Sequence, residues 1–402
     1  MVAIGELSTG VRTLIVLLPP SRRSRFVTLT HHIQYKQGPN NEKQPHTMKV
    51  RFQEANRSGG PSSSSSLPQE AIARLHGHES SISVVRFSKD GKYCLTGSYD
   101  RTVRLWNPLR LDPAHPPGAN TTAHNNADIP IEDLPQSLPI QVYHDGISHP
   151  VTAVAVDDAS TTLVAASEKT VVIHDVVTGQ CKRRLQGHTG RINAVAINCD
   201  AQAYLSASYD ASVRLWDGRS SRSYEPIQMF KQAKDSVTAV HTVQTDDLTL
   251  IRTASVDGIV RTYDLRKGML QCDDVGSPIT GLCATSDQRG LVVNCLDGAL
   301  RLIDVNQGKL VQQYADGHVA GQYGLDCAVS ADMDFVVTGS EDGSAVFYDG
   351  TKGRVCQVLE GQRQPTCSVA LHPNKDLASV AITASFDGTA VVWGNDGGLM
   401  QW

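Results

Sequence analysis

The chain has 402 residues, a net charge of −4, 19% charged residues and 33 glycines. That composition indicates a soluble, loop-rich globular protein with a large buried core. Residues 1–66 hold nine Lys and Arg against three Asp and Glu, a net charge of +6, which leaves −10 for the remainder. Because wrapping of nucleic acid needs many cations against phosphate groups, the acidic body argues against that function.

Residues 1–66 form a basic, serine-rich tail that we predict to be disordered. Its longest apolar run, Leu14 to Leu18, is too short to span a bilayer and makes a poor signal sequence. The Arg and Ser content resembles an organelle transit peptide, but we prefer a disordered extension. Met48 is an alternative start, since the Gly-Gly-Pro at 59–61 and the five serines after it lead directly into the folded pattern.

Two nearly identical segments indicate an internal repeat: TGSYDRTVRLW at 96–106 and SASYDASVRLW at 206–216. Such duplication is far commoner in structural units than in catalytic sites, so a repeat search comes first. An acidic anchor with an aromatic residue six positions later defines a register that recurs along the chain. Seven registers follow it, at Asp100, Glu168, Asp210, Asp257, Asp297, Asp342 and Asp387, although Asp297 has Ile303 at the aromatic position. Only the first step, of 68 residues, is out of line.

The residues around each anchor show the pattern expected of a small antiparallel sheet. In the first unit, short alternating strands are predicted at 82–87, 92–96 and 103–106. Four anchors are followed by Gly, which supplies the positive φ of a tight hairpin. One such sheet cannot bury both faces, whereas seven around an axis bury them against one another. We expect Ala71–Leu75 to pair beside Thr389–Trp393, which removes two exposed edges.

Gly-His pairs precede three of the anchors, at His78, His188 and His318. The combination of His, Ser, Asp and an aromatic residue at this spacing resembles the WD-repeat family. The resemblance implies a seven-bladed, all-β propeller in which a hydrogen-bonded tetrad pins each hairpin, since polar groups inside a blade must be paired. The predicted tetrad residues are His78, Ser98, Asp100 and Trp106; His188, Ser208, Asp210 and Trp216; His318, Ser340, Asp342 and Tyr348; and, in incomplete units, Asp257, Asp297, Asp387 and Trp393. The second unit departs most, with Glu168 and His174 at the expected Asp and Trp positions.

The predicted domain organisation is a tail at 1–66, a propeller at 67–395 and a short C-terminal tail at 396–402. Residues 107–146 form a Pro-, His- and Asn-rich insertion between the third and outer strands of the first unit, which we predict to be a disordered loop. Within it, the stretch from Ile131 to Leu134 is a candidate short motif for a partner.

No catalytic, metal or cofactor site is predicted. The nine cysteines are scattered without metal-ligand spacing and fit reduced core residues. His78, Ser98 and Asp100 admit interpretation as a hydrolytic triad, but the same residues recur where the blade repeats. No phosphate-binding loop or nucleophile elbow is present in the sequence. We therefore expect a protein without enzymatic activity.

More specific sequence segments narrow the resemblance to a subgroup of WD-repeat proteins, the mitogen-activated protein kinase organisers. It rests on WNPLR at 106–110, YDLRKG at 263–268, GSPIT at 276–280, LDGALRLID at 296–304 and LDCAVS at 325–330. The resemblance implies a monomeric scaffold for a multi-subunit complex in the nucleus and cytoplasm, without a membrane or an indicated RNA contact. Two roles are implied, assembly with splicing factors and scaffolding of a Raf–MEK–ERK kinase module, and splicing is preferred. A ubiquitin-ligase substrate receptor is a further alternative.

Two surfaces are candidate docking sites. On the geometry of the family, residues before the anchors and near the starts of the inner strands point to one rim. The predicted rim residues are Ser83, Tyr99, Arg191, Asn193, Tyr209, Thr238, Thr280, Asp326, Glu341 and Phe386, whose aromatic members suit a binding hot spot. The alternative is the basic run Lys182-Arg183-Arg184 with Arg219 and Arg222, which fits contact with an acidic partner or an RNA backbone, or else a solvated outer strand.

Overall fold

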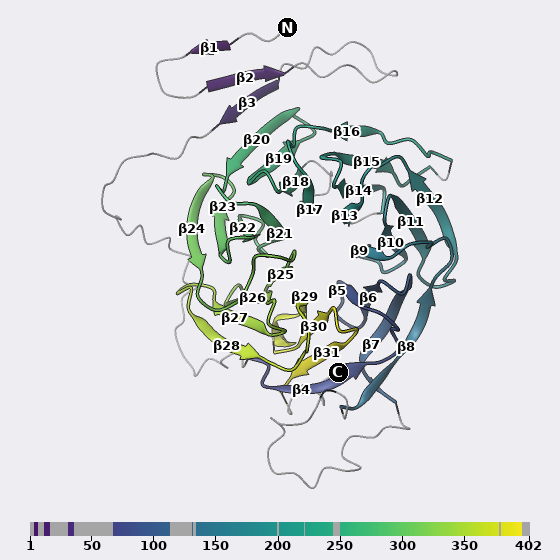
Figure 1. The fold of residues 1–402 in the computed structure, drawn as a ribbon. Helices are drawn as coiled ribbons and strands as arrows, with labels where there is room; N and C mark the ends of the chain where they lie inside the picture. Colours follow the sequence, from purple (N-terminus) through teal and green to yellow (C-terminus); the bar gives the residue numbers. More distant parts are fainter. Residues whose placement is uncertain are drawn as a thin grey trace.

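A computed structural model describes residues 4–6, 12–16, 31–35, 67–112, 131, 134–198, 201–220, 222–243, 250–377 and 379–395. In this part of the chain, strands β4 to β31 are arranged in four-stranded antiparallel units around a central axis (Figure 1). The described helical structure is one 3-10 turn, η3 (Lys375–Leu377). The all-β propeller predicted from the sequence is confirmed. No helix among the described residues is long and apolar enough to cross a bilayer.

The units are numbered here as blades 1 to 7 in chain order. Blade 1 comprises β5 (Ile82–Phe87), β6 (Cys94–Ser98), β7 (Val103–Leu111) and β8 (Gln136–Tyr143). Blade 2 comprises β9 (Val151–Val156), β10 (Thr162–Ser167), β11 (Thr170–Asp175) and β12 (Cys181–Gln186). Blade 3 comprises β13 (Ile192–Ile197), β14 (Ala203–Ser208), β15 (Val213–Asp217) and β16 (Gln228–Phe230). Blade 4 comprises β17 (Val237–Thr242), β18 (Leu250–Ser255), β19 (Ile259–Asp264) and β20 (Met269–Asp274).

The remaining blades follow the same order from the axis outward. Blade 5 comprises β21 (Ile279–Ala284), β22 (Gly290–Cys295), β23 (Leu300–Asp304) and β24 (Lys309–Tyr314). Blade 6 comprises β25 (Cys327–Val329), β26 (Phe335–Gly339), β27 (Ala345–Asp349) and β28 (Val355–Leu359). Blade 7 comprises β29 (Thr366–Leu371), β30 (Ala381–Ser385) and β31 (Ala390–Gly394), and its outer strand is β4 (Glu70–Leu75) from the N-terminal side.

The ring is closed by β4 and β31, which pair antiparallel with Ala390 opposite Leu75 and Val392 opposite Ala73. This is the predicted closure, and it covers the edge that β31 would otherwise expose. β4 also meets β8 of blade 1 in parallel, Arg74 opposite Gln136, so the closing strand contacts blades on both sides.

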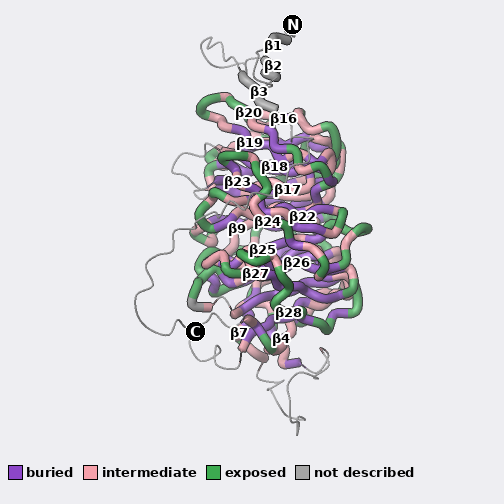
Figure 2. Tube along the Cα trace, turned by 90° about the vertical axis from the view of Figure 1, so that its left-hand side faces the viewer, coloured by how far each residue is buried: buried purple, intermediate pink, exposed green. Residues whose placement is uncertain are grey.

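The burial pattern follows from blades that stack face to face. Second strands such as β10 and β14 are buried along their whole length, because both faces meet a neighbouring blade. Outer strands such as β12 alternate between buried and exposed residues. Each seam between neighbouring blades encloses its own apolar cluster, and Trp106, Trp216 and Trp393 lie in three of them. Figure 2 shows the buried segments inside the ring and exposed turns at its edges.

The predicted 107–146 insertion is shorter in the structure. β7 continues to Leu111 and β8 begins at Gln136, with Leu111 opposite Ser137. The residues at both ends of the predicted insertion therefore belong to strands of blade 1. Most of the residues between these strands lie outside the described part of the chain. Ile131 and Leu134, ends of the candidate partner motif, pack instead into the seam between blades 6 and 7, where Leu134 is buried.

Within 1–66, where the sequence predicts a disordered tail, the structure describes three short strands, β1 (Ile4–Glu6), β2 (Arg12–Val16) and β3 (His31–Tyr35). β3 pairs in parallel with β20 on the outside of blade 4. The rest of this segment, and the predicted tail at 396–402, lie outside the described residues.

Candidate functional site

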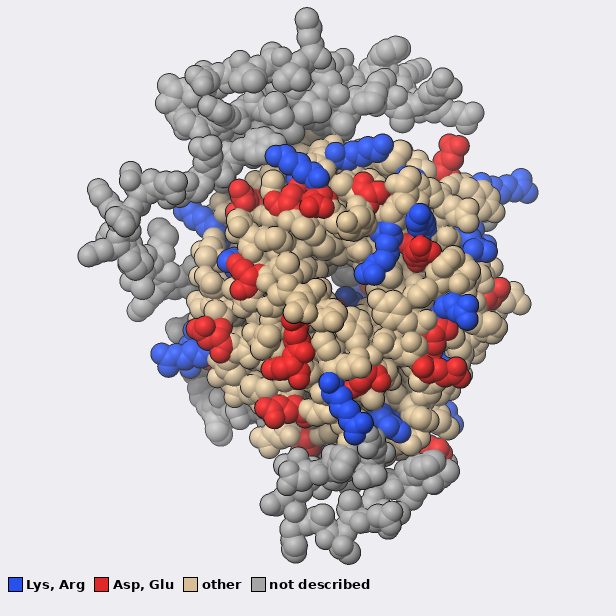
Figure 3. Space-filling model, in the orientation of Figure 1, with Lys and Arg blue, Asp and Glu red and all other residues tan. Residues whose placement is uncertain are grey.

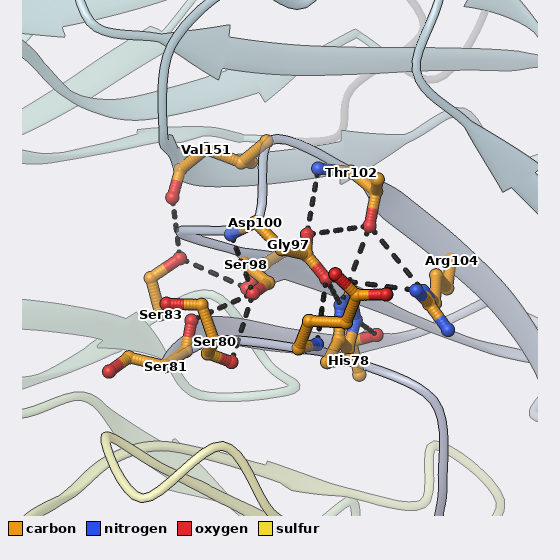
Figure 4. Close-up of polar contacts among 12 residues, drawn as sticks. His78, Ser80, Ser81, Ser83, Gly97, Ser98, Asp100, Thr102, Arg104 and Val151 are labelled. Atoms are coloured by element: carbon orange, nitrogen blue, oxygen red, sulfur yellow. Dashed lines mark hydrogen bonds and ion pairs between the residues drawn. The ribbon is translucent and has the colours of Figure 1, made fainter.

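A relay of buried hydrogen bonds crosses blade 1 from its hairpin turn to its tryptophan. Figure 4 shows the part of it around His78 and Asp100. His78 Nδ1 lies 2.7 Å from Asp100 Oδ2, and His78 Nε2 lies 2.6 Å from Thr96 Oγ1. Trp106 Nε1 donates to the same Thr96 hydroxyl at 2.8 Å. Because Asp100 is a carboxylate, His78 Nδ1 donates to it, and Nε2 of the neutral imidazole accepts the proton of Thr96, whose oxygen accepts from Trp106.

The titration behaviour of the relay agrees with this assignment. Burial lowers the pKa of His78, and the hydrogen bond to Asp100 only partly opposes that effect. Burial by itself would raise the pKa of Asp100, but hydrogen bonds from His78 and Thr102 hold it well below its usual range. The relay is therefore a neutral imidazole beside a carboxylate across the physiological pH range.

Blade 3 repeats the arrangement with Ser206 as the central hydroxyl. His188 lies 2.9 Å from Asp210 and 2.8 Å from Ser206 Oγ, to which Trp216 Nε1 donates at 2.9 Å. Burial lowers the pKa of His188 as it does that of its counterpart in blade 1.

Ser98 and Ser208 are not the hydroxyls that join histidine to tryptophan, and this corrects the predicted tetrads. Ser98 Oγ donates to the carbonyls of Ser80 and Ser81, at 3.1 and 2.9 Å, and accepts from the backbone N–H of Asp100 (Figure 4). Ser208 makes the equivalent contacts with Gly190 and Arg191. These two serines hold the hairpin turn against the preceding loop.

The hydrolytic-triad interpretation of His78, Ser98 and Asp100 is also contradicted. The two ring nitrogens of His78 lie against Asp100 and Thr96, whereas Ser98 is bonded to backbone groups. A nucleophile that is not within reach of its base lacks the arrangement that defines a triad.

Blades 6 and 7 keep parts of the relay. In blade 6, His318 Nδ1 lies 2.9 Å from the Tyr348 hydroxyl, while Asp342 accepts from Ser344 and Ser340 accepts from the N–H of Val319. The predicted bond between His318 and Asp342 is not formed. In blade 7, Trp393 donates to Thr383 at 2.8 Å.

Gln362 takes the histidine position in blade 7. Its side chain donates to Thr389 and accepts from Thr366 at 2.9 Å, and the N–H of Arg363 donates to Asp387 at 2.9 Å. The same carboxylate accepts from Thr389. The hairpin is therefore held by an amide in place of an imidazole.

Blades 4 and 5 lack the histidine, and an arginine four residues after the anchor binds the carboxylate directly. Arg261 Nη2 lies 2.6 Å from Asp257 Oδ2, and Arg301 Nη2 lies 2.6 Å from Asp297 Oδ2. Burial alone would raise the pKa of Asp257, but Arg261 and Ser255 lower it to about 2. In blade 2, Glu168 pairs with His149 at 3.2 Å on the surface, and buried His174 bonds the carbonyl of Asp145.

A ring of side chains next to the axis joins each blade to the following one. The residue after the start of each inner strand bonds the next strand: Ser83 donates to the carbonyl of Val151, Thr152 to Ile192, Asn193 to Val237, Thr238 to Ile279, Thr280 to Leu325, and Cys367 Sγ to Ile82. Blade 6 places Asp326 here, which accepts from Arg86 of blade 1 and from Ser368 of blade 7. Five predicted rim residues, Ser83, Asn193, Thr238, Thr280 and Asp326, therefore direct their polar atoms to the scaffold.

The inner strands enclose a central channel of about 860 Å³. Figure 3 shows its opening at the centre of the ring. Eight predicted rim residues line this channel, namely Ser83, Tyr99, Arg191, Asn193, Thr238, Thr280, Asp326 and Phe386, whereas Tyr209 and Glu341 lie beside it.

Aromatic side chains cluster at the mouth where the inner strands begin. The Tyr99 and Phe386 rings are 6.4 Å apart between centroids, and the Phe386 and Tyr323 rings 5.6 Å. Glu341 fixes the loop that carries Tyr323 by accepting from its N–H at 2.8 Å. Tyr209 is 69% exposed on blade 3, which blade 2 separates from Tyr99. The rim thus has apolar rings and polar groups in one concave region.

The basic run on β12 is largely engaged within the fold. Lys182 pairs with Asp175 at 2.8 Å, and buried Arg183 donates to the carbonyls of Asp217 and Ser220. Arg219 pairs with Asp217 at 3.4 Å. These contacts favour the interpretation as an outer strand tethered to blade 3 over that of a docking patch.

Comparison with known proteins agrees with this geometry. The model of the WD domain, G-beta repeat, matches residues 69–107, 179–217, 308–349 and 353–394. The chain belongs to the WD-repeat family, a class of β-propeller proteins that generally serve as scaffolds for protein interactions.

Among individual relatives, it is similar to WD repeat domain-containing protein 83 of Rattus norvegicus, with 35% identity over 81% of this chain and 92% of that protein. The Homo sapiens protein of the same name is 36% identical over 79% of this chain and 91% of its own length. The homologue in Dictyostelium discoideum is 28% identical over 79% and 96%.

Sequence reasoning missed the central hydroxyls Thr96, Ser206 and Thr383 and the substitutes for histidine, Arg261, Arg301 and Gln362. A signal existed for both sets. The hydroxyls stand four residues before their anchors, and the arginines stand four residues after.

Proposed function

We propose that this protein is a non-catalytic scaffold that assembles with splicing factors on the spliceosome, in the nucleus and cytoplasm. The observation that carries a docking role is the aromatic cluster of Tyr99, Phe386 and Tyr323 at the channel mouth. Rigid aromatic side chains beside a concavity supply apolar contact area at little cost in side-chain entropy. The resemblance to the kinase-organiser subgroup, whose members are described in splicing, directs the proposal to that complex.

The partner expected from this chemistry is a protein segment with an apolar anchor. The anchor would contact the rings of Tyr99 and Phe386, and Arg191, exposed at the same mouth, would contact a polar or acidic flank. The rim is fixed by the ring of bonds beneath it, so binding requires little reorganisation of the scaffold.

The test is affinity purification from nuclear extract with the double variant Tyr99→Ala and Tyr209→Ala. We expect at least a tenfold loss of splicing factors relative to the unaltered protein. Tyr224→Ala is the matched control, because Tyr224 is equally a surface tyrosine, 56% exposed, but precedes β16 away from the channel. Unchanged recovery with the double variant would exclude the rim as the docking site.

The same purification separates the alternative functions. Recovery of kinases of the Raf–MEK–ERK type, lost in the double variant, would favour a signalling scaffold. Recovery of a cullin adaptor would favour a substrate receptor of a ubiquitin ligase. Identification of the recovered proteins by mass spectrometry distinguishes the three.

A further inference from the structure

One buried position of the repeat is arginine in blade 4 and aliphatic in every other blade. On the second strand, opposite an apolar residue of the third strand, this position is Leu95, Val164, Leu205, Val292, Val337 and Ile382, all buried. The residue at this position in blade 4 is Arg252, which is 3% exposed. The repeat expects a hydrocarbon side chain here, and the chain places a guanidinium group instead.

Polar residues also stand opposite Arg252 on the two neighbouring strands. His241 of β17 lies opposite Arg252 in the sheet, and Thr262 of β19 lies opposite it on the other side. Five residues after the anchors, the position of Thr262 is again apolar in the other blades: Leu105, Ile173, Leu215, Leu302, Phe347 and Val392. Blade 4 therefore carries a polar row across its strands, and Arg252 of this row reaches blade 5, where it donates to the carbonyl of Gln288.

The guanidinium of Arg252 makes one hydrogen bond in the described part of the protein. Nη2 donates to the carbonyl of Gln288, on the β21–β22 turn of blade 5, at 2.9 Å. Nε and Nη1 are buried and have no partner, and the same is true of His241 Nδ1, Thr262 Oγ1 and Gln288 Oε1. Five unpartnered polar atoms are thus gathered at one seam, although buried polar groups are paired as a rule.

The charge of Arg252 is also without a counter-charge. No carboxylate among the described residues forms an ion pair with it, and Asp273, which is buried in the same blade, accepts from Gln271 at 3.1 Å. Burial lowers the pKa of Arg252, but arginine does not lose its proton in proteins. A buried, uncompensated charge costs several kcal/mol, so a negative ligand would gain correspondingly by binding beside it.

We propose that the seam between blades 4 and 5 binds a small inorganic anion, chloride under cellular conditions, between the guanidinium of Arg252, the imidazole of His241 and the hydroxyl of Thr262. The anion accepts from Nε or Nη1 of Arg252 and from the hydroxyl of Thr262, and so satisfies donors and charge together. A water molecule could accept from the same N–H and O–H donors, but it would not neutralise the positive charge of Arg252. His241, at the inner end of this polar row, also lines the central channel.

Substitution by the residue of the other blades gives a direct test of the site. Arg252→Leu is expected to fold, because Leu95 and Leu205 occupy the same register. Thermal unfolding is measured in sodium chloride and in sodium gluconate at equal ionic strength, since gluconate is too large for the seam. The unaltered protein should gain a few degrees in Tm as chloride rises to tenfold its dissociation constant, and Tm should continue to rise with the logarithm of the chloride concentration. Arg252→Leu should show the same Tm in both salts.

Arg219→Leu, which removes an exposed arginine, is the matched control and should retain the chloride effect. The proposal is overturned if the unaltered protein has equal Tm in the two salts, or if Arg252→Leu responds to chloride as the unaltered protein does.

A second measurement locates the ion. Crystals grown in bromide should give an anomalous peak within hydrogen-bonding distance of Arg252 Nη1, and none in Arg252→Leu crystals. Asp246 and Asp247 precede β18 in the sequence, outside the described residues. If a carboxylate of this pair, or water alone, occupies that position in bromide, the anion site is disproved.

Discussion

At the scale of single residues, one hydroxyl group in blade 1 satisfies two buried ring nitrogens. Thr96→Val keeps the shape of the side chain but leaves His78 Nε2 and Trp106 Nε1 unpaired. We expect a loss of about 1–3 kcal/mol in the free energy of unfolding, because each orphaned group has lost its water as well as its partner. Thr96→Ser, the residue that blade 3 uses, should be nearly neutral. Chemical denaturation checks both, and equal stabilities of the two variants would contradict the relay.

In the hairpin turns, one substitution is predicted to increase the stability of the protein. The residue after the anchor has positive φ in six blades, and four use glycine, such as Gly258 at +78°; blades 1 and 3 use Arg101 at +66° and Ala211 at +58°. Because a Cβ strains this conformation, Ala211→Gly should stabilise the protein by about 1 kcal/mol. Gly258→Ala should destabilise it by a similar amount. A fall in Tm for Ala211→Gly would show that the unfolded-state entropy of glycine outweighs the strain.

The residue scale also shows where sequence reasoning ends. Thr96 and Ser98 stand two positions apart on β6, so alternation places both side chains on the same face. The sequence identified His78, Asp100 and Trp106 but gave no register between strands, and the register decides which hydroxyl reaches the histidine. The same limit applies to Ser83 and Thr238: their exposure at the rim was predictable, whereas their bonds to the next blade depend on the distance between blades.

At the scale of elements, the closing strand β4 is the part that the rest of blade 7 depends on. Ala73 is fully buried opposite Val392, so Ala73→Asp forces an unpaired carboxylate into that seam. A loss of about 3 kcal/mol or more is expected, centred on blade 7. Hydrogen exchange should show faster exchange of the β31 amides at 390–394 and little change in β14 of blade 3. Arg74→Gln on the same strand is the control, and equal acceleration in both variants would contradict closure through Ala73.

Strand order followed from the alternation of apolar residues and the spacing of glycines, since these are local signals. Closure by the strand at 71–75 followed from the family resemblance. The ends of the 107–146 insertion could not be placed from the sequence, because prolines such as Pro108 and Pro139 are typical of loops. Both lie within the described strands β7 and β8, toward the outside of blade 1. Outer strands accept proline where one side of the backbone needs no partner. A composition-based boundary therefore stops short of the true strand ends.

The whole molecule should lose stability in acid in two stages. Six histidines have pKa values lowered by burial, namely His78, His174, His188, His241, His318 and His372, and that of His241 falls to about 4. Below about pH 6.5 the unfolded chain binds these protons and the folded chain does not, so stability is full above that pH and falls beneath it. Each histidine contributes up to about 1.4 kcal/mol per pH unit. The lowered pKa values of Asp100, Asp210 and Asp257 add a second loss below about pH 4.

Denaturation midpoints between pH 4.5 and 8 measure the first stage, and His78→Gln isolates one contribution to it. Gln362 shows that an amide fits this place in a blade, so the variant should fold while its stability changes less steeply between pH 5 and 6.5. The difference in slope should approach one bound proton, because a glutamine does not titrate in either state. A flat profile between pH 5 and 7 in the unaltered protein would mean that these imidazoles protonate within the folded ring, and the neutral relay in blade 1 would then have to be abandoned.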